Sequence, residues 1–220
     1  MLNRFFPRAL ADRLFFILLA LCLCAAASAD PAQCMDDPRE HVREIGRAID
    51  AADVNSFTEL VDMDALLNNA MDVFVKEASR PENAKRLPPM LALLLPGLTA
   101  SGSSPVKDLL LGEAKNFVMA GIASGAFAGR KPDPAKAQGM LAPLFNQASM
   151  GRKEIRNIGK PVKNGNGWLV PFVIYDYGSE NEYPIKALLE RRGEDLKLTG
   201  LENMRLLIYQ IGEESAGALE

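Results

Sequence analysis

The chain has 220 residues, a formal net charge of −3 and a single histidine, His41. This mildly acidic balance excludes the strongly basic surface by which nucleic-acid-binding proteins hold phosphates. One histidine excludes a histidine-rich metal centre, and no glycine-rich nucleotide loop follows an expected strand. We therefore expect no metal, no cofactor and no nucleic-acid partner.

The N-terminus is typical of a cleaved secretory signal. Basic residues precede the apolar run Leu14–Leu23, and Ala27-Ser28-Ala29 forms an A-x-A cleavage site before Asp30. The apolar run is shorter than the roughly 20 residues that a spanning helix needs. We expect residues 1–29 to be removed and the protein to be exported, most simply to a bacterial periplasm. An uncleaved N-terminal anchor is the alternative.

The remaining chain is long enough for one domain with its own core. We expect that domain at residues 30–212, helical over 37–148 and β over 153–202, followed by a flexible polar tail at 213–220. Only Cys34 survives cleavage, so no intramolecular disulfide is expected. Contact with a membrane surface stays open, but a membrane span is not expected after cleavage.

The helical half begins with a well-marked start. Asp37 is placed to cap a helix that opens at Pro38 and continues to about Ala52. Its apolar residues recur at spacings of three and four, which indicates one buried face. His41 is assigned to the opposite, solvated side.

Four further helical stretches are expected before residue 130, the first a short segment that carries Phe57, Leu60 and Val61. Asp62 is expected to cap a helix that ends near Ser79, and Met90–Leu95 is a nearly uncharged turn or two. Ser104 is expected to open the longest helix, whose second half, Phe117–Gly129, contains no charge. Small residues there favour close packing, and a wall facing lipid or ligand is the alternative. One more helix is expected from Asp133 to Phe145.

The C-terminal half predicts an antiparallel meander. The expected strands are Lys153–Lys163, Gly167–Tyr177, Glu182–Arg191 and Leu196–Leu201. The turn Asn164–Gly167 has residues that tolerate the positive φ of a type I′ hairpin, and Asn203–Ile211 is ambiguous between strand and helix. The fold class is therefore α+β, with N-terminal helices packed on a curved C-terminal antiparallel sheet of about four strands.

The second strand of the meander is apolar on both faces. Trp168, Val170, Phe172 and Ile174 alternate with a second apolar set on the opposite face. This pattern predicts cover on both sides of the strand, or a curled sheet that closes around a ligand. Pro171 cannot donate to a β-ladder, which predicts a bulge or a free edge beside it.

A cluster of tyrosines and acids surrounds the second hairpin. A carboxylate beside phenols at the mouth of an apolar pocket suits proton transfer, and Asp176 is the first candidate for such a base. An ordinary polar rim, or the rim of an interaction site, explains the same residues without catalysis.

Short stretches resemble known families. The helix end Asp50–Asp53 and the segment Phe57–Asp62 resemble small exported bacterial proteins of unknown function, and Leu196–Asn203 is similar to the last strand of cystatin-like cones, the nuclear-transport-factor-like superfamily. That resemblance implies helices on a curved sheet with a pocket between them. The layout is also similar to periplasmic phospholipid-binding carriers, which implies an apolar cavity.

These observations favour a non-enzymatic exported protein that binds an apolar small molecule or an envelope protein in a helix–sheet cleft. A periplasmic lipid carrier and a small isomerase-like or hydrolase-like enzyme are the alternatives. The residues expected to line the cleft are Phe117, Ile122, Phe172, Ile174, Tyr175 and Tyr183.

Overall fold

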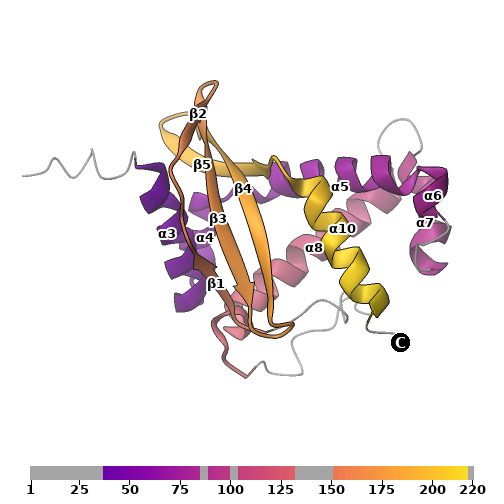
Figure 1. Ribbon diagram of the computed structural model, residues 1–220, viewed down its shortest axis with the longest axis horizontal. Coiled ribbons are helices and arrows are strands. Elements are labelled where there is room, and N and C mark those ends of the chain that lie inside the picture. The colour runs from indigo at the N-terminus through magenta and orange to yellow at the C-terminus, as the bar shows by residue number, and fades with distance from the viewer. Residues whose placement is uncertain (1–36, 85–88, 100–103, 132–150, 218–220) are drawn as a thin grey trace, which may run out of the picture. The chain divides into compact units, whose positions relative to one another are not determined.

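The computed structural model describes residues 37–84, 89–99, 104–131 and 151–217 (Figure 1). The chain divides into two compact units, Met1–Asp37 and Pro38–Glu220, and every described residue except Asp37 belongs to the second unit. The expected signal peptide, Cys34 and the expected helix from Asp133 to Phe145 lie outside the described residues.

Helices occupy most of the described N-terminal half, and one more follows the sheet. They are α3 Pro38–Ala51, α4 Val54–Leu60, α5 Met63–Ala78, α6 Pro81–Ala84, α7 Pro89–Thr99, α8 Pro105–Ala123 and α10 Met204–Gly217, with a 3-10 turn, η1, at Ala126–Ala128. The Asp62 carboxylate accepts a hydrogen bond from the Ala65 amide, and the Ser104 hydroxyl accepts one from the Lys107 amide. The cap expected at Asp62 is therefore confirmed, and Ser104, which was expected to open the longest helix, is its N-cap.

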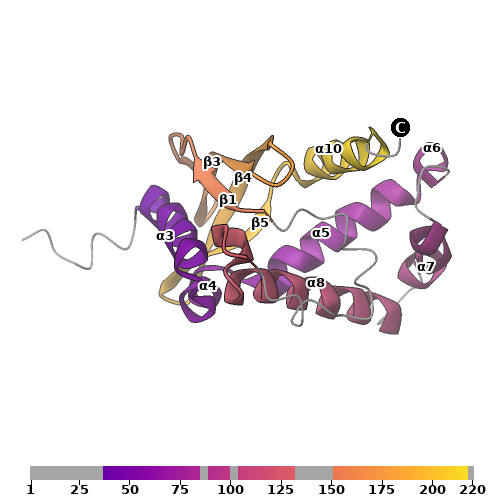
Figure 2. The ribbon, with the colours of Figure 1, turned by 90° about the horizontal axis from the view of Figure 1, so that it is seen from below.

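The strands form one antiparallel sheet. They are β1 Lys153–Arg156, β2 Val162–Asn164, β3 Gly167–Asp176, β4 Asn181–Arg192 and β5 Asp195–Leu201. The order is β1-β3-β4-β5, and β2 pairs with β3 on the same side as β1. The predicted α+β class is confirmed: helices from the N-terminal half pack against a C-terminal antiparallel sheet that does not close (Figures 1 and 2).

Pro171 explains why the first expected strand is split into β1 and β2. The Gly159 amide donates to the Pro171 carbonyl at 2.8 Å, so the polar side of Pro171 faces the segment between β1 and β2. Since N–H and C=O of one strand residue point the same way, the missing donor of Pro171 falls at this break. The irregularity expected near Pro171 is thus an interrupted neighbour, and the β-bulge lies elsewhere, between Leu188 and Leu189 of β4.

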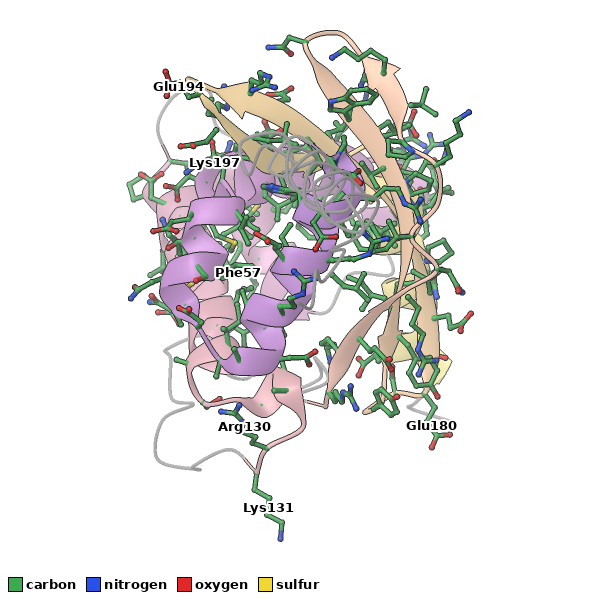
Figure 3. All side chains as sticks on the ribbon, turned by 90° about the vertical axis from the view of Figure 1, so that its left-hand side faces the viewer. Phe57, Arg130, Lys131, Glu180, Glu194 and Lys197 are labelled. Carbon is green, nitrogen blue, oxygen red and sulfur yellow. The ribbon has the colours of Figure 1, made fainter. Side chains whose placement is uncertain are left out.

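The main core lies between the helices and one face of the sheet. β3 contributes Val170 and Phe172, which are 0% and 5% exposed, and α3 contributes Val42, which is 0% exposed. Figure 3 shows the paired helices α3 and α4 beside the sheet, with Phe57 among them. A smaller second core joins α5, α7 and α8 around Leu98 and Leu110.

Three expectations about single residues or segments are changed by the structure. The prediction that His41 is solvated is wrong, because its ring is 8% exposed and its Nε2 lies 3.0 Å from the Leu60 carbonyl of α4. The ambiguous stretch 203–211 is helical, and α10 continues past Gly212 into the segment expected as a tail. At the hairpin between β2 and β3, Gly165 has φ +56° and Asn166 does not have a positive φ, so the type I′ turn is wrong.

Within the described ranges, no helix combines the length and the apolar character that crossing a membrane requires.

Candidate functional site

The residues expected to line an apolar cleft are mostly packed against one another. Phe172 and Ile122 are 5% and 1% exposed, and the Phe117 ring meets the Phe127 ring edge-on at 6.1 Å between centroids. All five of the inward-facing residues belong to the main core: Phe117, Ile122, Phe172, Ile174 and Tyr183. Tyr175 is separate, because alternation along β3 places it on the opposite face of the sheet.

Asp176, the candidate base, is held in an ion pair. Its carboxylate lies 2.8 Å from the Lys153 ammonium and accepts a hydrogen bond from the Gly178 amide at 2.8 Å. Lys153 also lies over the Phe127 ring. Burial lowers the pKa of Lys153, and the hydrogen bond and charge of Asp176 oppose that shift. This geometry gives Asp176 a structural partner at the junction of sheet and helices.

The edge of the sheet formed by β5 is covered by other segments of the chain. The Asp62 amide donates to the Leu198 carbonyl of β5 at 2.9 Å, which joins the start of α5 to the free side of that strand. Beyond the end of β5, the Asn203 side chain accepts from the Lys186 amide and donates to the Pro184 carbonyl. These contacts satisfy main-chain groups that would otherwise remain open to another chain.

The opposite edge of the sheet, formed by β1, borders a groove. A hollow of about 250 Å³ separates α3 from β1 and is the feature we call the β1 groove. The residues that line it are Arg43, Gly46, Arg47, Asp50, Arg152, Lys153, Glu154, Ile155 and Ile158. Four of these are basic and two are acidic, so the groove is locally cationic although the chain carries a net charge of −3.

Helix geometry explains how α3 supplies its part of the groove. Arg39, Arg43 and Arg47 recur every four residues and share one side of the helix. The space between α3 and β1 is kept narrow at Gly46, because a Cβ atom there would lie 3.6 Å from Cδ1 of Ile155. The floor of the groove is thus apolar and its walls carry guanidinium groups.

The outer face of the sheet, next to the groove, carries an arginine–tyrosine cluster: Arg152, Glu154, Arg156, Tyr175 and Tyr177. The Arg156 guanidinium lies 4.1 Å from the Tyr175 ring centroid, donates to Glu154 at 2.7 Å and donates to the Tyr177 hydroxyl at 2.8 Å. The Tyr177 hydroxyl donates to Glu154 at 2.7 Å.

Arg152 is held differently from Arg156. Its guanidinium lies 5.3 Å from the Tyr177 ring, and among the described residues it forms no ion pair. Stacked arginines and half-exposed tyrosines of this kind are enriched at protein–protein interfaces, where they lose little conformational entropy on binding.

The carboxylates around the groove are held ionised. Hydrogen bonds from Arg43 and then Arg47 lower the pKa of Glu40, at 2.7 and 2.6 Å. Hydrogen bonds from Tyr177 and then Arg156 lower the pKa of Glu154. Glu44 lies 3.6 Å from Arg47, and Asp176 lies 2.8 Å from Lys153, so these cations also have acidic neighbours. Among the described residues, Arg152 is the groove cation that forms no ion pair, and its guanidinium is suited to recognising an acidic group.

A second hollow, of about 230 Å³, lies on the α3–α4 side of the molecule. None of the six residues expected to bind an apolar ligand lines either hollow. In the part of the chain that the structure describes, no group of three or more histidine, cysteine, aspartate or glutamate side chains could hold a metal ion.

No family model, curated protein or solved structure matches this chain.

The sequence pointed to one part of this site and missed the rest. Tyr175 was among the expected binding residues, and the tyrosines of the second hairpin were considered as an interaction rim. The spacing of the three α3 arginines was visible in the sequence as a polar stripe. Its position beside Arg152 was not visible, because about a hundred residues separate α3 from β1.

Proposed function

We propose that this is an exported, non-enzymatic binding protein whose β1 groove holds an acidic segment of a partner protein. The observation that carries the proposal is the juxtaposition of the arginine-lined groove and the arginine–tyrosine cluster along one open side of the sheet. Guanidinium groups bind carboxylates through paired hydrogen bonds, and tyrosine supplies rigid contact area.

A protein segment fits the groove better than an apolar small molecule does. Pockets for drug-sized ligands usually enclose about 300–1,000 Å³ and are mainly apolar. The β1 groove is smaller, open and lined by four cations. The lipid-carrier alternative requires an apolar cavity, and the side chains expected to form that cavity occupy the core themselves. The enzyme alternative rests on Asp176, which is engaged by Lys153. The resemblance to cystatin-like cones remains a prediction.

The proposal is tested with a fluorescein-labelled acidic peptide of alternating glutamate and valine, six residues long. The protein is recovered from the envelope of an expressing bacterium, and binding is followed by fluorescence anisotropy. We expect measurable affinity that falls as NaCl is raised, because exposed ion pairs are screened. The same peptide with lysine in place of glutamate should not bind.

Charge reversal in the groove provides the decisive comparison. R43E/R152E should weaken binding by at least about tenfold, since each reversal replaces an attraction by a repulsion. The matched control, K197E/R205E, changes the net charge equally on β5 and α10 and should leave affinity within about twofold. Equal losses in both variants, or no binding of the acidic peptide by the wild type, would contradict the proposal.

A further inference from the structure

The main-chain N–H and C=O groups of β1 point alternately toward β3 and away from it. The Tyr177 amide donates to the Arg152 carbonyl at 2.9 Å, so the polar groups of Arg152 face β3. The register continues with Lys153 opposite Asp176 and Ile155 opposite Ile174. Because the polar groups of successive strand residues point to alternate sides, those of Ile155 point away from β3.

The main-chain N–H and C=O of Ile155 that point away from β3 lie beside the β1 groove. Ile155 lines the groove, and no described residue bonds its main-chain N–H or C=O on that side. The contrast with the other edge is direct, because there the Asp62 amide bonds the Leu198 carbonyl of β5 and the Asn203 side chain bonds the Lys186 amide of β4. An uncovered strand edge pairs readily with another extended chain.

From this geometry we infer that the partner's acidic segment binds as an additional antiparallel or parallel β-strand on β1, with its main chain hydrogen-bonded to Ile155. The inference rests on the proposed function and specifies the conformation of the segment. Strand addition provides affinity through the main chain, and the flanking side chains provide selectivity.

The charges on both sides of β1 specify the kind of segment. Side chains of an added strand alternate between the groove side, where Arg43 and Arg47 lie, and the outer side, where Arg152 and Arg156 lie. A strand that carries an acidic residue at every second position therefore meets arginines in either register. Its other positions contact the apolar floor at Ile158 or the Tyr177 ring.

The test measures amide hydrogen exchange by NMR on the full chain, with and without the alternating glutamate–valine peptide. We expect the exchange of the Ile155 amide to slow by at least about tenfold when the peptide is bound, because the amide gains a hydrogen bond. The amides of Glu154 and Arg156 face β3 and should show no comparable change.

Two N-methylated peptides provide the control on the ligand. One carries methyl groups on the glutamate nitrogens and the other on the valine nitrogens, so that each blocks main-chain donation from one edge and leaves every charge unchanged. One of the two should bind at least about tenfold more weakly than the unmodified peptide.

The outcomes separate this inference from the proposed function. Peptide binding that depends on Arg43 and Arg152 but leaves the Ile155 amide unchanged, with both methylated peptides equally active, would overturn strand addition and retain the acidic-segment proposal. Failure of the acidic peptide to bind at all would overturn both.

Discussion

His41 was assigned to the wrong side of a correctly predicted helix. It precedes Ile45 by four residues and Ala48 by seven, so it lies on the buried side of α3. Its Nε2–H donates to the Leu60 carbonyl, which fixes the neutral tautomer. Burial lowers the pKa of His41 below the ordinary value of 6.5, and the hydrogen bond to Leu60 opposes this shift.

We predict that His41 makes the protein less stable as the pH falls below about 6.5. The unfolded chain binds the proton there while the folded histidine stays neutral, so the free energy of unfolding decreases until the pH reaches the lowered pKa. Urea unfolding should be compared for the wild type and H41Q from about pH 7.5 to 5.5. The wild type should lose more stability than H41Q over this range, and parallel curves would contradict the prediction.

The ion pair between Lys153 and Asp176 is the other buried polar contact with a measurable consequence. Asp176 is 4% exposed, whereas 22% of the Lys153 side chain is exposed. Removing one partner leaves the other without its counter-charge, which costs about 3–5 kcal/mol in a fully buried pair. The partial exposure of Lys153 lowers our expectation to about 2 kcal/mol for D176N or K153M.

The double variant K153M/D176N should be less destabilised than the sum of the two single variants, because no unpaired charge remains. Urea unfolding of all four proteins measures this coupling. Additive losses would show that the two residues act independently and would contradict a structural ion pair.

At the level of elements, the C-terminal end of α8 depends on glycine in a way that the sequence only partly indicated. We expected small residues there to permit close packing. The structure places the Phe127 ring directly over Gly121, so that an added Cβ would overlap the ring. Gly125 and Gly129 instead adopt positive φ, at +72° and +80°, and flank the turn η1 that carries Phe127 back onto α8.

We predict opposite effects for two alanine substitutions in α8. G121A should lower the free energy of unfolding by about 1–3 kcal/mol, because Phe127 is buried against Phe117 and cannot move freely. G112A should raise it by up to about 1 kcal/mol, since Gly112 is an exposed helix residue with open space around its Cβ position. Urea unfolding measures both, and destabilisation by G112A would contradict this explanation.

Local sequence signals predicted the order and type of the elements. They did not predict where a strand is interrupted or that 204–217 is a helix. Alternation and turn residues located β3, β4 and β5 within one or two residues. The break between β1 and β2 depends on which side of β3 the Pro171 nitrogen faces, and this is set by strand order. The helical form of α10 depends on tertiary contacts, including the Tyr209 hydroxyl bond to the buried Glu77 of α5 at 2.8 Å.

For the molecule as a whole, the two edges of the sheet differ in how far other segments cover them. Main-chain and side-chain contacts cover β5 and the half of β4 that does not pair with β5. In contrast, β1 borders a groove lined by arginines. Figure 3 shows the two ends of the sheet marked by Glu180 in the turn between β3 and β4 and by Glu194 in the turn between β4 and β5. This asymmetry is the reason we propose the β1 edge as the binding surface.

The most direct test of this account is photo-crosslinking in the envelope of living cells. A benzophenone amino acid is introduced in place of Ile158, on the floor of the β1 groove, and in a second variant in place of Lys197 on β5. We predict a discrete protein adduct from the groove position that is lost in the R43E/R152E background, and no such adduct from β5. An adduct from β5 alone, or a groove adduct unaffected by R43E/R152E, would contradict the assignment of the β1 groove as the partner-binding site.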